Sequence, residues 1–310
     1  MPDLLIRIGT RGSKLALAQT QIVIDYLRRQ AADGRYQIIE IKTSGDTDKH
    51  TALPEIGGQG IFTKKIEQEL LKGNIDLAVH SAKDLPSVMT KGLAIGAVLQ
   101  RESPEDVWIS GKGYRFDEFP KGGIVGTSSP RRKALLLNRR PDLCIKDIRG
   151  NLETRLRKLA DDEYEAIVVA RAGLKRLGLD DIDMQILPVD DFIPAAGQGF
   201  LVVQIREGDK SSAALVSGID NKSARRCLEI ERKVLEKLNA GCSTPIGCLA
   251  RINSGGVHVS TCVLDRKGKK RLNADGKIDI SEANEVMIDD IISSLLSQGA
   301  RELIRTTHED

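Results

Sequence analysis

The chain has 310 residues, of which 40% are hydrophobic and 29% charged, the composition of a globular protein long enough for about two domains. Its 47 basic and 44 acidic residues leave a net charge of +3, and only 3% of the residues are aromatic. This balance argues against a dedicated nucleic-acid binder, which gathers positive charge and stacking aromatics. No apolar run is long enough to cross a membrane, and the N-terminus lacks the apolar core of a signal peptide.

The first two thirds of the sequence alternate short apolar runs with helical patterns, which predicts an α/β fold whose mostly parallel sheets are covered by helices. The predicted strands are Leu4–Ile8, Tyr36–Ile41, Ile75–Val79, Leu93–Leu99, Gly123–Gly126, Leu143–Ile148, Ala166–Ala170 and Phe200–Ile205. The predicted helices are Lys14–Arg29, Thr63–Lys72, Pro130–Asn138, Leu152–Ala160 and Ala172–Leu177. No internal repeat is evident in the sequence.

Two of these helices have well-marked beginnings. Ser13 precedes a stretch with helical apolar spacing and is a candidate N-cap, because a serine oxygen accepts the free N–H groups of a first turn. Ser129 is followed by Pro130, a residue that suits the first helical position. A strand, a Gly-Thr-Ser-Ser turn and a helix start follow one another here, and such a helix N-terminus favours an anion.

The last third of the sequence has a different pattern. Arg225–Leu238 predicts a helix, and the turn-like segment NAGCSTPIG follows it. The runs LARI, VHVSTCVLD and KIDI predict short strands separated by the turns NSGG, RKGKK and NADG, and a closing helix lies within Ala283–Ile304. Strands followed by one or two helices indicate a small α+β domain.

Two polar or glycine-rich segments mark the crossings between the predicted α/β lobes. The chain leaves the first lobe near Arg101–Asp106, where the sequence is RESPED, and returns near Pro194–Gly199, where it is PAAGQG. A chain that crosses twice makes two hinged lobes with a cleft between them, which is a common place for a ligand.

Five arginines lie near predicted strand-to-helix turns: Arg11, Arg131, Arg132, Arg149 and Arg155. The stretch from Arg131 to Lys158 holds ten basic and three acidic residues. Guanidinium groups bind carboxylates and phosphates through a planar fork, and α/β proteins bind ligands at this edge of the sheet. The set therefore indicates a polyanionic ligand, and the alternative is a group of solvated surface charges.

Asp84 and Cys242 are the candidate reactive groups. Asp84 follows a predicted strand in LAVHSAKDLP, where a carboxylate could stabilise a cation or move a proton; the alternative is a loop aspartate paired with Lys83. His80 is interpreted as a satisfied strand residue. Cys242 lies in a glycine-flanked loop, where nearby cations would favour its thiolate; the alternative is an inert loop thiol.

The other cysteines, Cys144, Cys227, Cys248 and Cys262, are interpreted as packing residues. Five cysteines without CxxC spacing do not predict a disulfide framework, and they favour a reducing compartment. Cys242 and Cys248 have no histidine nearby, so the sequence predicts no metal site.

The sequence resembles the porphobilinogen deaminase family, whose members are also called hydroxymethylbilane synthases. The matching stretches run in family order from Ile8 to Gly247: IGTRGSKLALAQ, IKTSGD, GGQGIFTK, DLAVHSAKDLP, GTSSPRRKALL, IRGNLETRL, VVARAGLKRLG, PAAGQG and GCSTPIG. The segment after Cys248 adds little by motif. Gln59 stands where the family often has lysine, and Phe200 stands where it usually has a small residue.

The resemblance implies a transferase of tetrapyrrole, porphyrin and heme biosynthesis. Four porphobilinogen molecules would be joined head to tail with release of ammonia, and hydrolysis would release linear 1-hydroxymethylbilane. The family carries a dipyrromethane cofactor, built from two porphobilinogen units and held by a thioether to the loop cysteine. In this chain that cysteine would be Cys242.

The resemblance also assigns roles to individual residues. Asp84 would be the catalytic carboxylate that contacts pyrrole N–H groups and stabilises the positive charge of the azafulvene formed as ammonia leaves. The cofactor would be held by Cys242, Lys83, Asp84, Ser129, Arg131 and Arg132. The substrate carboxylates would be bound by Arg11, Ser13, Thr127, Arg149, Arg155, Arg176 and Gln198.

At the level of the whole chain, the resemblance implies two lobes like those of periplasmic binding proteins and a small C-terminal α+β domain. Residues 1–100 with 198–220 would form the first lobe, 101–197 the second, and 221–310 the domain that carries the cofactor cysteine. The protein would be a cytoplasmic monomer with no nucleic-acid partner and no membrane association.

Two other functions compete with the deaminase. A non-catalytic two-lobed anion-binding module would explain the lobes and the arginines, but it gives no purpose to GCSTPIG and predicts no covalent pyrrole. A nucleic-acid protein using the segment from Arg131 to Lys158 predicts strongly salt-dependent affinity, and the even charge and scarce aromatics count against it.

Overall fold

The computed structural model describes residues 5–30, 34–42, 63–240, 244–279 and 284–306. The chain divides into two compact units: unit 1 is Met1–Glu102 with Gly199–Arg226, and unit 2 is Ser103–Gln198 with Cys227–Asp310. The finer division into three domains stays a prediction.

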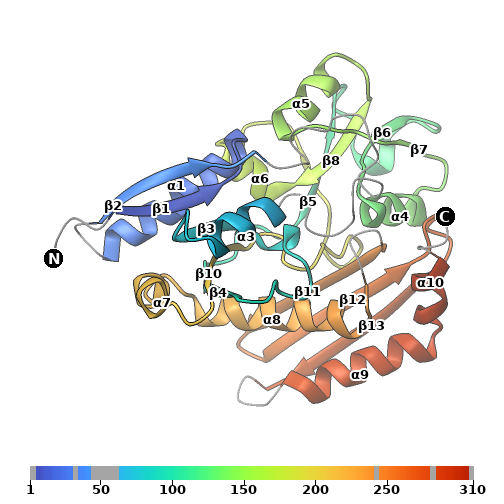
Figure 1. Cartoon of the computed structure of the whole chain (residues 1–310). Coiled ribbons are helices and arrows are strands. Elements are labelled where there is room, and N and C mark those ends of the chain that lie inside the picture. The colour runs from blue at the N-terminus through green and yellow to red at the C-terminus, as the bar shows by residue number, and fades with distance from the viewer. Residues whose placement is uncertain (1–4, 31–33, 43–62, 241–243, 280–283, 307–310) are drawn as a thin grey trace. The chain divides into compact units, whose positions relative to one another are not determined.

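Unit 1 contains one sheet, with helices between its strands (Figure 1). Its elements are β1 (Leu5–Thr10), α1 (Lys14–Gln30), β2 (Arg35–Glu40), α3 (Lys64–Leu71), β3 (Leu77–Ser81), a 3₁₀ turn (Ala82–Asp84), β4 (Leu93–Val98), β10 (Leu201–Arg206) and α7 (Lys210–Ser217). Helix α8 (Lys222–Lys237) begins in unit 1 and ends in unit 2.

The sheet of unit 1 has the strand order β2-β1-β3-β10-β4. β1 is parallel to both of its neighbours, whereas β10 is antiparallel to β3 and to β4. Apolar residues of the strands and of α1 form the core. Fully buried members of this cluster are Ile8, Val23, Leu77 and Val203. The parallel-rich sheet confirms the predicted fold class, and the single antiparallel strand modifies it.

Unit 2 begins with a second sheet of the same plan. Its elements are β5 (Asp106–Ser110), a 3₁₀ turn (Phe116–Glu118), β6 (Ile124–Gly126), α4 (Pro130–Arg139), β7 (Cys144–Lys146), α5 (Leu152–Ala160), β8 (Ala166–Ala170), α6 (Arg171–Arg176) and β9 (Gln185–Ile186). The strand order is β7-β6-β8-β5-β9, in which only β5 is antiparallel to its neighbours. In each sheet, the antiparallel strand is the first strand after the chain crosses from the other unit.

The two sheets share a sequence detail at β1 and β6, each the second strand in the order of its sheet. β1 ends in Gly9-Thr10, and β6 ends in Gly126 followed by Thr127. A Cβ at Gly9 would lie 2.3 Å from Ile75 Cδ1, and a Cβ at Gly126 would lie 2.8 Å from Tyr164 Cδ1. Each glycine therefore leaves room for an apolar side chain that packs over the strand end, and this repeat was not evident in the sequence.

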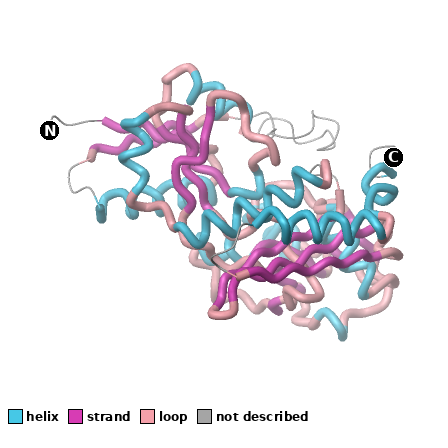
Figure 2. Tube along the Cα trace, turned by 90° about the horizontal axis from the view of Figure 1, so that it is seen from below, coloured by secondary structure: helices cyan, strands magenta, loops and turns pink. Residues whose placement is uncertain are grey.

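A second sheet in unit 2 is antiparallel and C-terminal. Its strands are β11 (Ile246–Asn253), β12 (Gly256–Leu264) and β13 (Arg271–Ile278), and they are followed by α9 (Asn284–Ser297) and α10 (Ala300–Thr306). Helix α9 lies along this sheet in both views (Figures 1 and 2). Leu249, Cys262 and Leu264 belong to the same buried cluster as Trp108 and Leu135, so the two sheets of unit 2 share a core.

The third strand of this sheet corrects a prediction. NADG was expected to be a turn, but Asn273–Gly276 lies inside β13. Helix α9 explains the glycine: a Cβ at Gly276 would lie 2.7 Å from Met287 and 2.8 Å from Ile291. The glycine permits close helix packing here rather than a chain reversal.

Other elements differ from the predictions in smaller ways. The strands β5 and β9 and the helix α7 were not predicted. Cys227, Cys248 and Cys262 are buried as expected, whereas Cys144 is exposed on β7, so its interpretation as a packing residue was wrong. Among the described residues, no helix is both long and apolar enough to span a bilayer.

The only tryptophan gives a fluorescence reporter for unit 2. Trp108 is 1% exposed, donates its Nε1–H to Tyr114 O at 2.9 Å, and packs edge-on against Phe116 and Phe119. We predict blue-shifted emission from the native protein and a red shift on unfolding. Phe119→Ala should destabilise this transition by about 3–5 kcal/mol. Leu71→Ala, at a 45% exposed position, should not. Red-shifted native emission would contradict the packing.

Candidate active site

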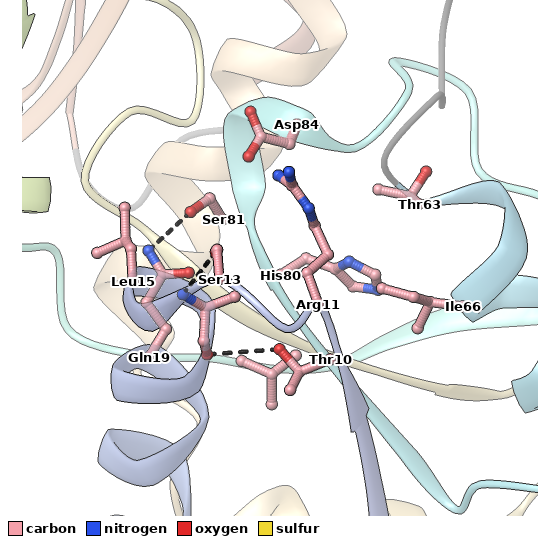
Figure 3. A pocket seen from close by; sticks show the side chains of 12 residues that line it. Thr10, Arg11, Ser13, Leu15, Gln19, Thr63, Ile66, His80, Ser81 and Asp84 are labelled. Carbon is pink, nitrogen blue, oxygen red and sulfur yellow. Dashed lines mark hydrogen bonds between the residues drawn. The ribbon is translucent and has the colours of Figure 1, made fainter. Parts of the chain in front are cut away.

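A pocket in unit 1 lies where the parallel strands β1 and β3 end (Figure 3). It encloses about 430 Å³, including space open to solvent. Its lining comes from the ends of both strands, the beginnings of α1 and α3, and the 3₁₀ turn; the residues are Thr10, Arg11, Ser13, Leu15, Ala16, Gln19, Thr63, Ile66, Val79, His80, Ser81 and Asp84. The carboxyl edge of a sheet is the expected place for a ligand in such folds.

Local hydrogen bonds fix the start of α1 against this edge. Ser13 Oγ accepts the N–H of Ala16 at 3.3 Å, which confirms Ser13 as the N-cap. Gln19 on the next turn donates to Ser81 Oγ at 3.0 Å, so α1 is joined to the end of β3. These bonds hold the Arg11 turn and the Asp84 turn beside one another.

Asp84 ends the 3₁₀ turn that follows β3, and its side chain is exposed. In Figure 3 the Arg11 side chain extends toward the Asp84 carboxylate. No ion pair to Asp84 is present among the described residues, so the alternative of a loop aspartate paired with Lys83 is not observed. The backbone of the turn is fixed, because Ala82 N–H donates to Phe200 O at 3.0 Å. Asp84 is thus an exposed carboxylate on a turn whose backbone is fixed, and it lines the pocket.

A buried polar chain lies under this pocket. His80 Nε2 is 3.1 Å from Gln204 Oε1, and Gln204 Nε2 donates to Glu67 Oε1 at 2.9 Å. Glu67 also accepts from Thr90 Oγ1 at 2.9 Å. Because Glu67 takes the amide N–H of Gln204, the amide oxygen faces His80, and His80 carries its proton on Nε2. This confirms the interpretation of His80 as a satisfied strand residue.

Burial also keeps this imidazole neutral. His80 is 5% exposed, and loss of solvation lowers its pKa to about 4, although the hydrogen bond to Gln204 acts the other way. His80 therefore contributes no positive charge to the pocket at neutral pH. Thr63 adds a different polar group: its Oγ1 is buried at the pocket wall and has no hydrogen-bond partner within the described ranges.

Unit 2 repeats the arrangement of strand ends and helix starts. β6, the neighbour of both β7 and β8, runs parallel to them, so these three strands end at the same edge. Ser129 Oγ accepts the N–H of Arg132 at 3.4 Å, and Pro130 occupies the first helical position, as predicted. Asn151 caps α5 by accepting from Thr154 N–H at 2.9 Å. Two helix N-termini therefore meet one edge.

Arg131 and Arg132 occupy the first turn of α4, but they do not lie in solvent. Their exposed fractions are 4% and 7%, so the alternative of solvated surface charges is wrong for this pair. Arg131 Nη2 lies 2.8 Å from Asp106 Oδ2, and Arg132 Nη2 lies 2.7 Å from Asp106 Oδ1. Burial alone would raise the pKa of Asp106, but the two guanidinium groups hold it well below its usual range.

Gln198 joins the same cluster. It is 1% exposed, and its Nε2 donates to Asp106 Oδ1 at 2.9 Å and to Pro104 O at 2.7 Å. The structure therefore brings together three of the predicted residues, Arg131, Arg132 and Gln198, around a carboxylate that sequence reasoning missed. Asp106 was missed because it ends the polar RESPED segment, which was interpreted as a boundary.

The remaining predicted residues lie at several places in the two units. Thr127 is buried directly after β6, and its Oγ1 accepts from Ser129 N–H at 3.3 Å. Arg155 donates to Gly150 O at 2.9 Å, which holds it over the start of α5. Arg149, Arg176 and, in unit 1, Lys83 are half-buried. Cys242 and Gln59 lie outside the described residues.

Phe200 lies between β10 and the second crossing. It is 1% exposed, and the Arg101 guanidinium lies over its ring at 4.3 Å from the centroid. Its carbonyl accepts from the turn that carries Asp84. The larger side chain at this position is thus accommodated by packing and by a cation–π contact within unit 1.

Two family models match the chain, and together they span most of its length. Residues 6–214 match the model described as porphobilinogen deaminase, dipyromethane cofactor binding domain, and residues 225–289 match porphobilinogen deaminase, C-terminal domain. The chain belongs to the porphobilinogen deaminase family. The first match includes the Asp84 turn, the Arg131–Arg132 pair and Gln198.

Curated relatives agree with the family models over nearly the full length. The porphobilinogen deaminase of Syntrophomonas wolfei is 40% identical over 304 residues, covering 98% of this chain and 99% of the relative. That of Geobacillus kaustophilus is 42% identical over 307 residues, with 98% of each covered. Among solved structures, the BenM effector binding domain aligns with a TM-score of 0.42 and 16% identity, covering 69% of this chain and 90% of that one.

The described residues of unit 2 suit a group that carries carboxylates. Two guanidinium charges and one carboxylate leave the Arg131–Arg132–Asp106 cluster with one positive charge. Arg131 Nε is buried and has no hydrogen-bond acceptor among the residues that the structure describes. A carboxylated pyrrole would supply both the missing charge and an acceptor, so these residues fit the dipyrromethane of the family. Within the described ranges no group of His, Cys, Asp and Glu side chains could hold a metal.

The neutral state of His80 predicts a pH dependence of stability. The pKa of His80 falls from 6.5 to about 4 on folding, so protonation favours the unfolded chain. Its stabilising contribution is complete above about pH 6.5 and is lost as the pH falls toward about 4. In urea titrations, wild type should lose about 2–3 kcal/mol more than His80→Gln between about pH 7 and about pH 4.5. Equal losses would contradict a buried neutral imidazole.

Proposed function

We propose that this chain is a hydroxymethylbilane synthase. It joins four porphobilinogen molecules head to tail with loss of ammonia and releases linear 1-hydroxymethylbilane by hydrolysis. The observation that carries the proposal is the near-complete match to the porphobilinogen deaminase models, which includes both the Asp84 pocket and the arginine cluster. The alternative of a non-catalytic anion-binding module leaves the Cys242 loop without a purpose.

The cofactor is the covalent dipyrromethane of the family. When bound, it supplies a free pyrrole α-carbon to which the first substrate unit is joined. Cys242 holds it through a thioether, and the other residues assigned to it are Lys83, Asp84, Ser129, Arg131 and Arg132. Support for this assignment in unit 2 comes from the uncompensated positive charge and the unpaired Nε–H of Arg131.

The substrate is recognised through its carboxylate charges. Each porphobilinogen unit carries an acetate and a propionate, so a growing chain of up to about six rings brings about twelve carboxylates. Arginine forks and hydroxyl groups at strand ends are suited to such groups because they donate several N–H and O–H bonds in fixed directions. The residues assigned to this role are Arg11, Ser13, Thr127, Arg149, Arg155, Arg176 and Gln198.

Asp84 acts on the reacting centre. Departure of ammonia from porphobilinogen leaves positive charge on the pyrrole, and a carboxylate held at the pocket mouth stabilises that charge and accepts the pyrrole N–H. The fixed turn, the exposed carboxylate and the neighbouring Arg11 side chain support this role. The neutral His80 beneath the pocket does not oppose the developing cation.

The proposal extends to the state of the protein in the cell. Porphobilinogen is its small-molecule partner. It acts as a monomer in the cytoplasm and has no nucleic-acid partner. The near-neutral charge balance and the low aromatic content support the absence of a nucleic-acid role.

The covalent cofactor gives the most direct test. Electrospray mass measurement of the purified protein should show an excess equal to two linked pyrrole units. Cys242→Ser should lack this excess, because the thioether cannot form. A protein with the bare mass should gain the excess on incubation with porphobilinogen. Failure to gain it would favour the non-catalytic binding module.

Asp84→Asn should keep the fold and lose at least about a hundredfold in turnover, because the amide cannot balance the cation that forms as ammonia leaves. Porphobilinogen consumption and the melting midpoint are measured together. Asp25→Asn on α1, where Asp25 accepts from Gln21 Nε2 at 2.8 Å, is the matched control and should retain turnover. Near-normal turnover of Asp84→Asn would remove the catalytic assignment.

A further inference from the structure

Asp106 accepts hydrogen bonds from three side chains of unit 2. It is the first residue of β5 and is 1% exposed. Its Oδ2 accepts from Arg131 Nη2 at 2.8 Å. Its Oδ1 accepts from Arg132 Nε at 3.0 Å, from Arg132 Nη2 at 2.7 Å and from Gln198 Nε2 at 2.9 Å. Three side chains from α4 and from the PAAGQG segment therefore converge on one carboxylate.

Two buried guanidinium groups could not lie this close together without a counter-charge. Burial lowers the pKa of Arg131, and the neighbouring charge of Arg132 acts in the same direction. Asp106 offsets one of the two positive charges and leaves the other. The three charged side chains of the cluster thus carry one net positive charge.

The orientation of each arginine is also set. Arg131 Nη1 donates to Ile193 O at 2.9 Å, and Arg132 Nη1 donates to Val168 O at 3.2 Å. With Nη2 of Arg131 on Asp106, its Nε–H is the edge left without an acceptor. The carboxylate of Asp106 therefore helps to set the orientation of Arg131, whose buried Nε–H has no acceptor among the described residues.

The third partner of Asp106 is anchored from a distance. Gln198 follows Gly197, whose N–H donates to Glu231 Oε2 at 2.6 Å. Glu231 is 0% exposed, lies on α8, and also accepts from Ala250 N–H at 2.8 Å. One buried carboxylate thus joins the PAAGQG turn to β11, and that turn presents Gln198 to the second buried carboxylate.

We propose that Asp106 is a positioning residue for the dipyrromethane cofactor, which holds Arg131 and Arg132 side by side and leaves the cluster one positive charge for a cofactor carboxylate. The inference rests on the proposed function and deepens it. Asp106 itself does not touch the reacting atoms; it acts through the two arginines.

The test measures cofactor attachment rather than turnover. Apo-protein of wild type, Asp106→Asn and Asp106→Glu is incubated with porphobilinogen, and the covalent group is followed over time by intact mass. Both variants should attach it at least about tenfold more slowly than wild type, because Asn removes the counter-charge and Glu keeps the charge but displaces it. Melting midpoints are measured on the same samples.

Asp76→Asn is the matched control in unit 1. Asp76 also receives an arginine fork, from Arg7 Nε at 3.0 Å and Nη2 at 2.7 Å, and lies 3.8 Å from Arg206. Its loss should lower the melting midpoint and leave attachment at the wild-type rate. This comparison separates a positioning role from a general loss of stability.

The outcomes are distinct. Slow attachment by folded Asp106→Glu, with normal attachment by Asp76→Asn, supports the proposal. Three results would overturn it. The first is attachment at the wild-type rate by either folded Asp106 variant. The others are slower attachment by Asp76→Asn in proportion to its lower melting midpoint, and failure of both Asp106 variants to fold. If wild type itself never gains the covalent group, the proposed function fails instead.

Discussion

The arginine cluster of unit 2 depends on one constraint: buried positive charges of like sign require a buried carboxylate between them. Asp106 supplies it, and four hydrogen-bond donors from α4 and the PAAGQG turn meet on its two oxygens. A buried ion network of this kind contributes little net stability, because desolvation offsets most of the attraction. Its value lies in geometry, since it fixes the orientation of two neighbouring guanidinium groups.

Much of the fold could be predicted from the sequence because its signals are local. Apolar runs located most strands of the α/β lobes, and the Ser13 and Ser129 caps began helices where the structure has them. The failures have physical causes. Asp106 begins a buried strand from within a polar segment, so its partners, more than twenty residues away, are what identify it. In β13, Gly276 serves the packing of α9, and its turn-like neighbours concealed a strand.

The candidate site shows the same division between local and distant information. The arginines and Asp84 were found from their places after strands, and the resemblance to a family gave them roles. Their surroundings were not visible in the sequence: the buried position of Arg131 and Arg132, and the Glu67–Gln204–His80 chain that leaves the imidazole neutral. Both depend on side chains that come together from different elements, and the residue spacing within one element does not predict such contacts.

The place of β10 in unit 1 has a consequence for synthesis on the ribosome. β10 lies between β3 and β4, yet it follows them by about a hundred residues, after the chain has passed through unit 2. A nascent chain that has not reached residue 206 leaves the facing edges of β3 and β4 unpaired, and such edges are prone to join other strands. The N-terminal lobe therefore cannot complete its sheet in the order in which it is made, and its folding waits for the lobe encoded after it.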